Sequence, residues 1–297
     1  MTPKPSTPHP KLPPVKTVWD LLSATYTAWR RNNTSTMGAA LAFYTTFSMA
    51  PLLIIITAIF GVILGKNTVQ VEILRRAQEL IGVQGAEAVR TMIEAAYRPG
   101  AGHTATLLGI GVIIYGSTSA LVMLKQALNL MWGGRPSPRA AIWNLVKERL
   151  LSLFMILIIG LLLMLSLVLS IVLSFVTGFL QDLVPVPVAM IQLADLVLSI
   201  LLVTLLFAVV FKVLPDVDIA WSDVWIGAAI TAGLFTLGKF LFGLYLGRSS
   251  ITSAYGAASS LAIILMWVYY SAQVFFIGAE FTQVFANRFG ARVKPRS

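Results

Sequence analysis

Six long apolar stretches follow one another along this 297-residue chain, and they constrain its fold more than any other feature. An α-helix rises 1.5 Å per residue, so about 20 apolar residues are enough to cross a hydrocarbon layer of roughly 30 Å. No segment between the stretches is long enough for a soluble domain. We therefore predict an all-α fold, a polytopic transmembrane helical bundle that forms a single membrane domain over residues 15–290. The six predicted spans are residues 38–64, 105–131, 150–178, 187–213, 221–247 and 256–285.

The basic residues outside the predicted spans are distributed unevenly between the two sides of the membrane. Segments on the side of the two termini carry 14 Lys and Arg, whereas loops on the other side carry six. Because cytoplasmic loops carry an excess of Lys and Arg, this asymmetry predicts that both termini lie in the cytoplasm. The formal charge of +10 is therefore spread over short segments beside the spans, which is not the pattern of a nucleic-acid-binding face.

The two ends of the chain are predicted to lie outside the bundle. Residues 1–14 are rich in proline and predict a disordered cytoplasmic tail, and residues 291–297 predict a short basic cytoplasmic tail. The first 37 residues lack the apolar core and cleavage site of a secretory signal, so we expect the first span to act as an uncleaved insertion signal. Trp19, Leu22 and Tyr26 recur at helical spacing, which predicts an amphipathic helix in the headgroup region.

The outer loop, residues 65–104, contains two runs of apolar residues at helical spacing. Glu72 with Arg76, and Glu94 with Arg98, are four residues apart, which suits ion pairs on exposed helix faces. The loop therefore predicts two short amphipathic helices on the outer surface. A structural cap and a lid that moves over a pathway require the same pattern, so both interpretations stay open.

Four ionisable residues lie within the predicted spans: Lys125, Asp195, Lys239 and Glu280. Charged groups are costly in hydrocarbon, so they usually face a bundle interior or a wet cavity and find partners. Asp195 and Lys239 have matching depths in the outer half of the membrane, and Lys125 and Glu280 have matching depths in the cytoplasmic half. Each set is therefore a predicted pair of opposite charge, which either locks helices together or lines a substrate pathway.

Six uncharged polar residues accompany these charges: Gln126, Asn129, Gln192, Tyr269, Tyr270 and Gln273. Tyr269, Gln273 and Glu280 repeat at spacings of four and seven residues, which places them along one side of the sixth predicted helix. This polar stripe is suited either to hydrogen bonds between helices or to the lining of a pore.

Small residues in the first and fifth predicted spans indicate close contacts between helices. Gly38 begins a run of small residues, and Gly243 and Gly247 are four residues apart. Because small residues let helix backbones approach one another, we expect helix packing at these positions.

The composition and the motifs argue against an enzyme. The chain has no cysteine, so it has no disulfide, no thiolate metal site and no cysteine nucleophile. Its sequence has no His, Asp and Glu cluster with metal-ligand spacing, no phosphate-binding glycine loop and no serine with a histidine base. With 57% hydrophobic and 11% charged residues, it also differs from soluble enzymes. We expect no enzymatic activity, no metal and no cofactor.

Four segments in this order resemble the YihY/virulence factor BrkB family of bacterial inner-membrane proteins. They are residues 38–53 (GAALAFYTTFSMAPLL), 115–133 (YGSTSALVMLKQALNLMWG), 214–247 (LPDVDIAWSDVWIGAAITAGLFTLGKFLFGLYLG) and 255–280 (YGAASSLAIILMWVYYSAQVFFIGAE). The resemblance covers residues 15–290 and implies six spanning helices in the inner membrane, with membrane lipids as partners. All the candidate charged residues except Asp195 lie within these segments.

The resemblance implies no settled activity, although lipid or lipid-precursor transport and serum resistance are among the roles suggested for the family. The older family label ribonuclease BN is a misassignment on physical grounds, because this sequence has no clustered metal ligands and no basic groove for nucleic acid.

Two functions compete at this point. The first is transport of a lipid or another amphipathic molecule, with the intramembrane charges facing a polar cavity. The second is a scaffold or assembly partner for envelope proteins, in which the charges only hold the bundle together. We find no internal repeat of the kind that many transporters contain, which weakens the first hypothesis. The sequence indicates no oligomeric state.

Overall fold

The structure is a computed structural model that describes residues 15–96, 103–134, 149–162, 188–248, 258–291 and 293–295, with the isolated positions 146, 165 and 169. The predicted tail at residues 1–14 lies outside the described residues. Most of the third predicted span beyond residue 162 lies outside them as well.

Helices dominate the described part of the chain, as predicted. They are α1 (Val15–Arg31), α2 (Thr34–Leu64), α3 (Lys66–Ala96), α4 (His103–Trp132), the helical segment Arg149–Leu162, α6 (Val188–Val213), α7 (Trp221–Arg248) and α9 (Ser259–Phe289). Two strands of two residues each, β1 (Val217–Asp218) and β2 (Lys294–Pro295), pair antiparallel.

Four of the described helices are long and apolar enough to cross a membrane. The candidate spans are Thr34–Val62, Leu196–Val213, Trp221–Tyr245 and Ser259–Phe289. Helix α4 covers the second predicted span, and Arg149–Leu162 covers the first part of the third. The membrane-protein character is therefore confirmed, while the count of six spans stays a prediction.

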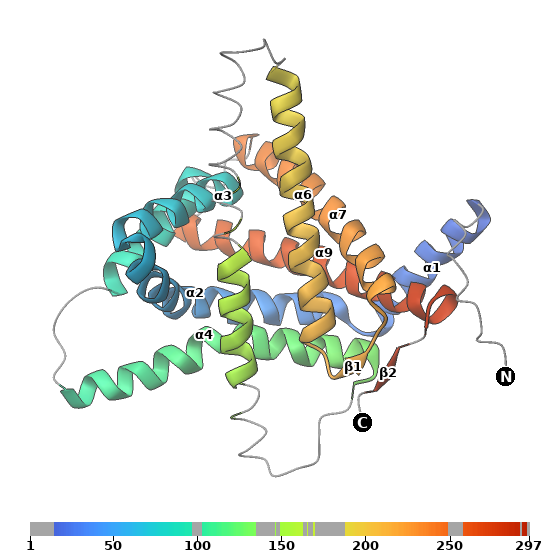
Figure 1. Cartoon of the computed structure of the whole chain (residues 1–297), viewed down its shortest axis with the longest axis horizontal. Helices are drawn as coiled ribbons and strands as arrows, with labels where there is room; N and C mark the ends of the chain where they lie inside the picture. Colours follow the sequence, from blue (N-terminus) through green and yellow to red (C-terminus); the bar gives the residue numbers. More distant parts are fainter. Residues whose placement is uncertain are drawn as a thin grey trace, which may run out of the picture.

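Helix α9 is the element against which most of the bundle packs. It contacts α1, α2, α3, α4 and α7, while α6 packs on α7 and α4 packs on α2 (Figure 1). An aromatic cluster joins three of these helices, because the Phe211 ring of α6 lies 4.9 Å from Phe275 of α9 and 5.8 Å from Trp132 of α4. The Trp132 indole Nε1 also donates a hydrogen bond of 3.0 Å to the backbone oxygen of Ala279. Large buried rings with a satisfied polar atom make this region the core of the fold.

Glycines allow the close approach of α7 and α9. A Cβ at Gly227 of α7 would overlap Thr282 of α9, and a Cβ at Gly278 of α9 would overlap Thr231 of α7. The prediction for Gly38 is confirmed, because a Cβ there would overlap the Gln273 amide of α9. The prediction for Gly243 is wrong, since this residue is exposed with open space around its Cα, and Gly247 lies outside the described side chains.

The residues of the predicted outer loop form the two halves of α3, which meet at Gly82. Gly82 has φ 74°, a left-handed conformation that glycine adopts without strain, and the chain changes direction there. The predicted pair is confirmed, because Arg76 Nε lies 2.9 Å from Glu72 Oε1. Glu94 instead pairs with Arg90, at 2.9 Å, and Arg98 lies outside the described residues.

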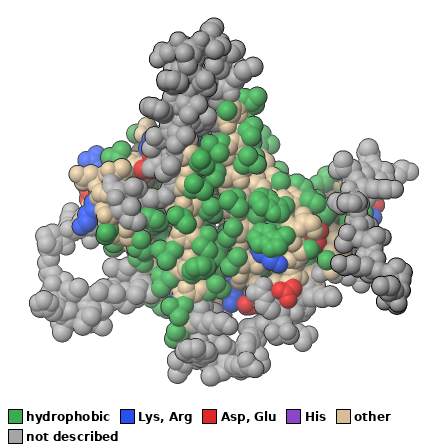
Figure 2. Space-filling model, viewed as in Figure 1, with side chains coloured by type: hydrophobic (Ala, Val, Ile, Leu, Met, Phe, Trp, Pro, Cys, Tyr) green, Lys and Arg blue, Asp and Glu red, His purple; other side chains and the backbone are tan. Residues whose placement is uncertain are grey.

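Apolar side chains cover much of the outer surface of the bundle. Figure 2 shows them across the middle of the face on which α6 lies, with charged side chains near α3 and near β1. Leu193, Leu201, Leu237, Phe240 and Leu241 of α6 and α7 are all more than half exposed. Apolar patches of this extent are typical of a surface that contacts lipid.

Candidate functional site

An apolar cavity of about 430 Å³ lies between α2 and α3. One wall comes from α2 and the other from the two halves of α3, while Trp267 of α9 and Gly160 of the segment Arg149–Leu162 also contribute to the lining. Its lining is aliphatic or aromatic except for three residues, Thr68, Glu72 and Arg76, which all belong to α3. The apolar lining residues are Met49, Leu52, Leu53, Ile56, Phe60, Val69, Ile73, Ala77, Leu80, Ile81, Val89, Gly160 and Trp267.

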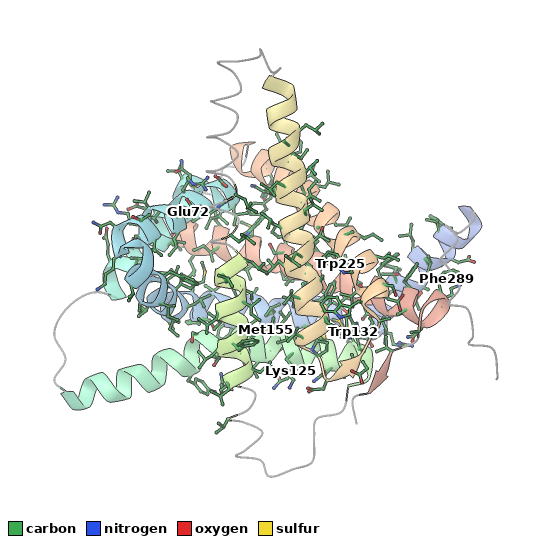
Figure 3. The ribbon with its side chains drawn as sticks, in the orientation of Figure 1. Glu72, Lys125, Trp132, Met155, Trp225 and Phe289 are labelled. Atoms are coloured by element: carbon green, nitrogen blue, oxygen red, sulfur yellow. The ribbon has the colours of Figure 1, made fainter. Side chains whose placement is uncertain are left out.

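The polar edge of this cavity is a cluster of charges on α3, and Glu72 is labelled there in Figure 3. Arg75 Nη2 lies 2.6 Å and Arg76 Nε 2.9 Å from Glu72 Oε1, and both arginines also pair with Glu79. Burial raises the pKa of Glu72, but the hydrogen bonds and charges of Arg75 and Arg76 outweigh burial and hold this pKa below its ordinary value. The edge is therefore charged at neutral pH and balanced in sign. An apolar pocket with one charged edge has the distribution of polarity that an amphipathic molecule requires.

The polar stripe predicted on the last helix faces the junction between α1 and α2. The Trp29 indole donates to Gln273 Oε1 at 3.2 Å, and the Tyr269 hydroxyl lies 2.9 Å from Ser35 Oγ. The Asn32 amide donates to Glu280 Oε1 at 2.6 Å. The stripe therefore forms hydrogen bonds between helices, which is one of the two uses that its spacing predicted.

The predicted pairing of Lys125 with Glu280 is wrong. Lys125 Nζ lies 2.9 Å from Asp216 Oδ2, in the segment between α6 and β1, and Glu280 takes Asn32 as its partner instead. Asn129 completes this cluster, because its amide nitrogen donates to Asp216 Oδ2 at 2.9 Å and its amide oxygen accepts from the Asp216 backbone N–H at 2.7 Å. Matching positions along two predicted spans do not determine the rotation of the helices, which decides the partner. Lys125 and Trp132 are labelled in this region in Figure 3.

The remaining candidate residues do not gather in one place. The Asp195 side chain lies outside the described residues, so its pairing with Lys239 stays a prediction, and Lys239 is half-buried on α7. Tyr270 packs against Gly238, the neighbour of Lys239, because a Cβ at Gly238 would overlap the Tyr270 hydroxyl. Gln126 is exposed, on a different side of α4 from buried Lys125 and Asn129.

Three functional candidates escaped the sequence interpretation: the α3 side of the cavity, Asp216 and Asn32. Asp216 and Asn32 lie outside the predicted spans, where a search for intramembrane charges does not reach. The pair Asn32 and Asn33 was the signal available in the sequence, because asparagine is one of the few residues that adopt a positive φ at a helix junction, as Asn33 does with φ 49°. Within the described residues, no group of three His, Asp or Glu could hold a metal ion.

The chain was compared with models of protein families. A family model described as virulence factor BrkB matches residues 25–297. The chain is also similar to membrane proteins described as UPF0761. It is 29% identical over 254 residues to one from Rhodospirillum centenum, which covers 84% of this chain and 54% of the relative.

Two further relatives have the same description. The one from Azotobacter vinelandii is 26% identical, with 82% of this chain and 57% of the relative covered. The one from Pseudomonas aeruginosa strain LESB58 is 27% identical, with 81% of this chain and 56% of the relative covered. The chain thus spans about half the length of these relatives. No solved structure matches it.

Proposed function

The chain belongs to the virulence factor BrkB family of bacterial membrane proteins, and from that premise we propose that it transports a lipid or another amphipathic molecule across the inner membrane. The observation that carries this proposal is the apolar cavity between α2 and α3. A molecule with an acyl chain fills the cavity, and its polar group lies beside Glu72 and Arg76. The proposal involves no catalytic chemistry.

The placement of the cavity supports transport. Its walls join a candidate membrane span, α2, to the amphipathic helices of α3, so an acyl chain can enter it from the lipid phase. The two halves of α3 meet at Gly82, which gives this wall a point at which it can bend. The lid interpretation of the loop therefore becomes part of the proposal.

The charged residues of the predicted spans do not belong to the proposed transport site, although their sequence positions suggested that they line a pathway. Lys125, Lys239 and Glu280 do not line the cavity. Lys125 and Glu280 instead join segments that are distant in the sequence, through Asp216 and Asn32. These contacts favour the second candidate, a scaffold or assembly partner for envelope proteins, because they hold helices together without any pathway.

A photoreactive phospholipid tests whether the cavity holds lipid. We expect a phospholipid with a diazirine in its acyl chain to cross-link to α2 or α3 residues of the cavity, identified by mass spectrometry of the digested protein. Replacing Ala77 of the lining by tryptophan fills the cavity, so the change should reduce cross-linking at least fivefold. Ala58→Trp is the matched control, because Ala58 is an exposed residue of α2 that does not line the cavity. Equal labelling of the two variants would exclude the cavity as the binding site.

Both termini in the cytoplasm remain part of the proposal, and the fold supports a shared side. Helix α1 packs against the end of α9, where Arg288 Nη2 lies 3.3 Å from Asp20 Oδ2. We expect reporter fusions at residue 5 and after residue 297 to give a cytoplasmic signal, and a fusion at residue 85 to give a signal from the other side. A cytoplasmic signal at residue 85 would contradict the proposed orientation.

A further inference from the structure

One buried acid has no role in the cavity described above. Glu280 is 0% exposed, and its only described hydrogen bond comes from the Asn32 amide to Oε1. Four buried side-chain oxygens of the described residues have no partner, and Oε2 of Glu280 is the only carboxyl oxygen among them. A carboxylate with a bare oxygen in a closed apolar site is costly, whereas a protonated carboxyl group needs far less solvation.

The charged groups on the helices around Glu280 do not neutralise it. Arg31 of α1 acts on it electrostatically, but this side chain is exposed and forms no ion pair with it. Helix α2 contains no charged residue. The charged residues of α4 and α7 lie elsewhere, since Lys125 pairs with Asp216 and Asp223 accepts a hydrogen bond from the Ala291 backbone N–H. The Glu and Arg residues of α3 pair with one another, and no described ion pair joins Lys239 of α7 to Glu280.

A surface hollow with a mixed polar and apolar lining lies near this acid. It has a volume of about 620 Å³ and lies between α1 and the end of α9, with Thr27, Arg31, Gln283 and Asn287 in its lining. Gln283 is three residues after Glu280 on the same helix, which is about 4.5 Å along the axis. The Asn32 amide that holds Glu280 directly follows Arg31 in the chain. Water in this hollow is therefore separated from the carboxyl group by about one helical turn.

We propose that Glu280 is a proton-binding site that exchanges its proton with the cytoplasmic side through this hollow. In the state described here the carboxyl group carries the proton on Oε2, the oxygen that has no hydrogen-bond partner. When α1 moves away from α9, the Asn32 hydrogen bond breaks, and water of the hollow accepts the proton as hydronium and leaves a carboxylate. Proton binding to Glu280 does not depend on the proposed function. The further step, that this proton drives transport, rests on the proposed function.

Infrared difference spectroscopy of the full chain in nanodiscs tests the site without any lipid substrate. We expect the wild type to show the C=O stretch of a protonated carboxylic acid that disappears as pH rises, and Glu280→Gln to lack this band. Glu94→Gln is the control, because Glu94 is an exposed acid of α3, and it should leave the band unchanged. Asn32→Ala should shift the midpoint of the titration while the band persists.

Four outcomes would overturn the proposal. The first is that the wild type shows no band at any pH. The second is that the band persists unchanged over the whole pH range. The third is that Glu280→Gln retains the band. A band that sodium ions displace at constant pH would also overturn it, because the site would then take a metal cation. Glutamine has the shape of the protonated acid, so Glu280→Gln should fold, and its thermal unfolding serves as the check on this point. If the proton site is found but lipid does not cross-link to the cavity, only the transport function fails.

Discussion

Replacing Gly278 by leucine should destabilise the protein by about 3 kcal/mol or more, or prevent its assembly. Even a Cβ at this position would overlap Thr231 of α7, and a larger side chain would force α7 and α9 apart along a contact that Gly227 and Thr282 repeat one turn away. The measurement is thermal unfolding of the purified protein in detergent, compared with the wild type. The matched control is Gly233→Leu, because Gly233 lies on α7 with open space around it.

The control separates steric overlap from a general effect of leucine. Leucine favours helix over glycine by roughly 1 kcal/mol, so Gly233→Leu should be neutral or slightly stabilising. The alanine Cβ of Gly278→Ala overlaps the Thr231 side chain, so this variant should be destabilised. Adding Thr231→Gly removes that side chain from α7 and should restore stability. Equal unfolding temperatures for Gly278→Leu and Gly233→Leu would show that α7 and α9 do not meet at these glycines.

The second large effect concerns the ion pair of Lys125 and Asp216. Asp216→Ala leaves the Lys125 ammonium in a site where its side chain is only 10% exposed, and it removes the hydrogen bond that the Asn129 amide donates to Asp216 Oδ2. Loss of one partner of a buried pair costs about 3 to 5 kcal/mol. Because the Asp216 side chain is 32% exposed, we expect a smaller loss of about 2 to 3 kcal/mol in thermal or denaturant unfolding.

An exposed pair provides the comparison for this change. Asp20 and Arg288 are 3.3 Å apart, with side chains 56% and 43% exposed, so Asp20→Ala should cost less than about 1 kcal/mol. Lys125→Met combined with Asp216→Ala should cost less than the sum of the single changes, because the double variant leaves no unpaired charge. Strictly additive losses would contradict the pairing.

The positions of the helices could be predicted well from the hydrophobic pattern. An apolar segment in lipid must satisfy its own backbone hydrogen bonds, and a helix does so. The predicted span 187–213 and helix α6 (Val188–Val213) differ by one residue at most. The two halves of α3 could be predicted from the helical spacing of their apolar residues. Both patterns depend only on residues close together in the chain, so they can be read from one sequence without knowledge of the fold.

Contacts between distant segments were predicted less well. Lys125 and Glu280 are both buried, as expected of charges in spans, yet each has a partner from outside the spans, Asp216 and Asn32. The partner depends on helix rotation and on the path of short connecting segments, which depth along the membrane normal does not determine. The cavity was missed for the same reason, since it exists only once α3 folds back on α2.

Movement of lipid by the purified protein tests the central claim most directly. We expect proteoliposomes that contain the wild-type chain to transfer a fluorescent phospholipid between leaflets, with loss of fluorescence after an external quencher as the readout. Protein-free vesicles and vesicles with Ala77→Trp should transfer it at least tenfold more slowly, while Ala58→Trp should match the wild type. If wild-type vesicles quench no faster than protein-free vesicles, with phospholipids and their precursors alike, transport is contradicted and the scaffold function takes its place.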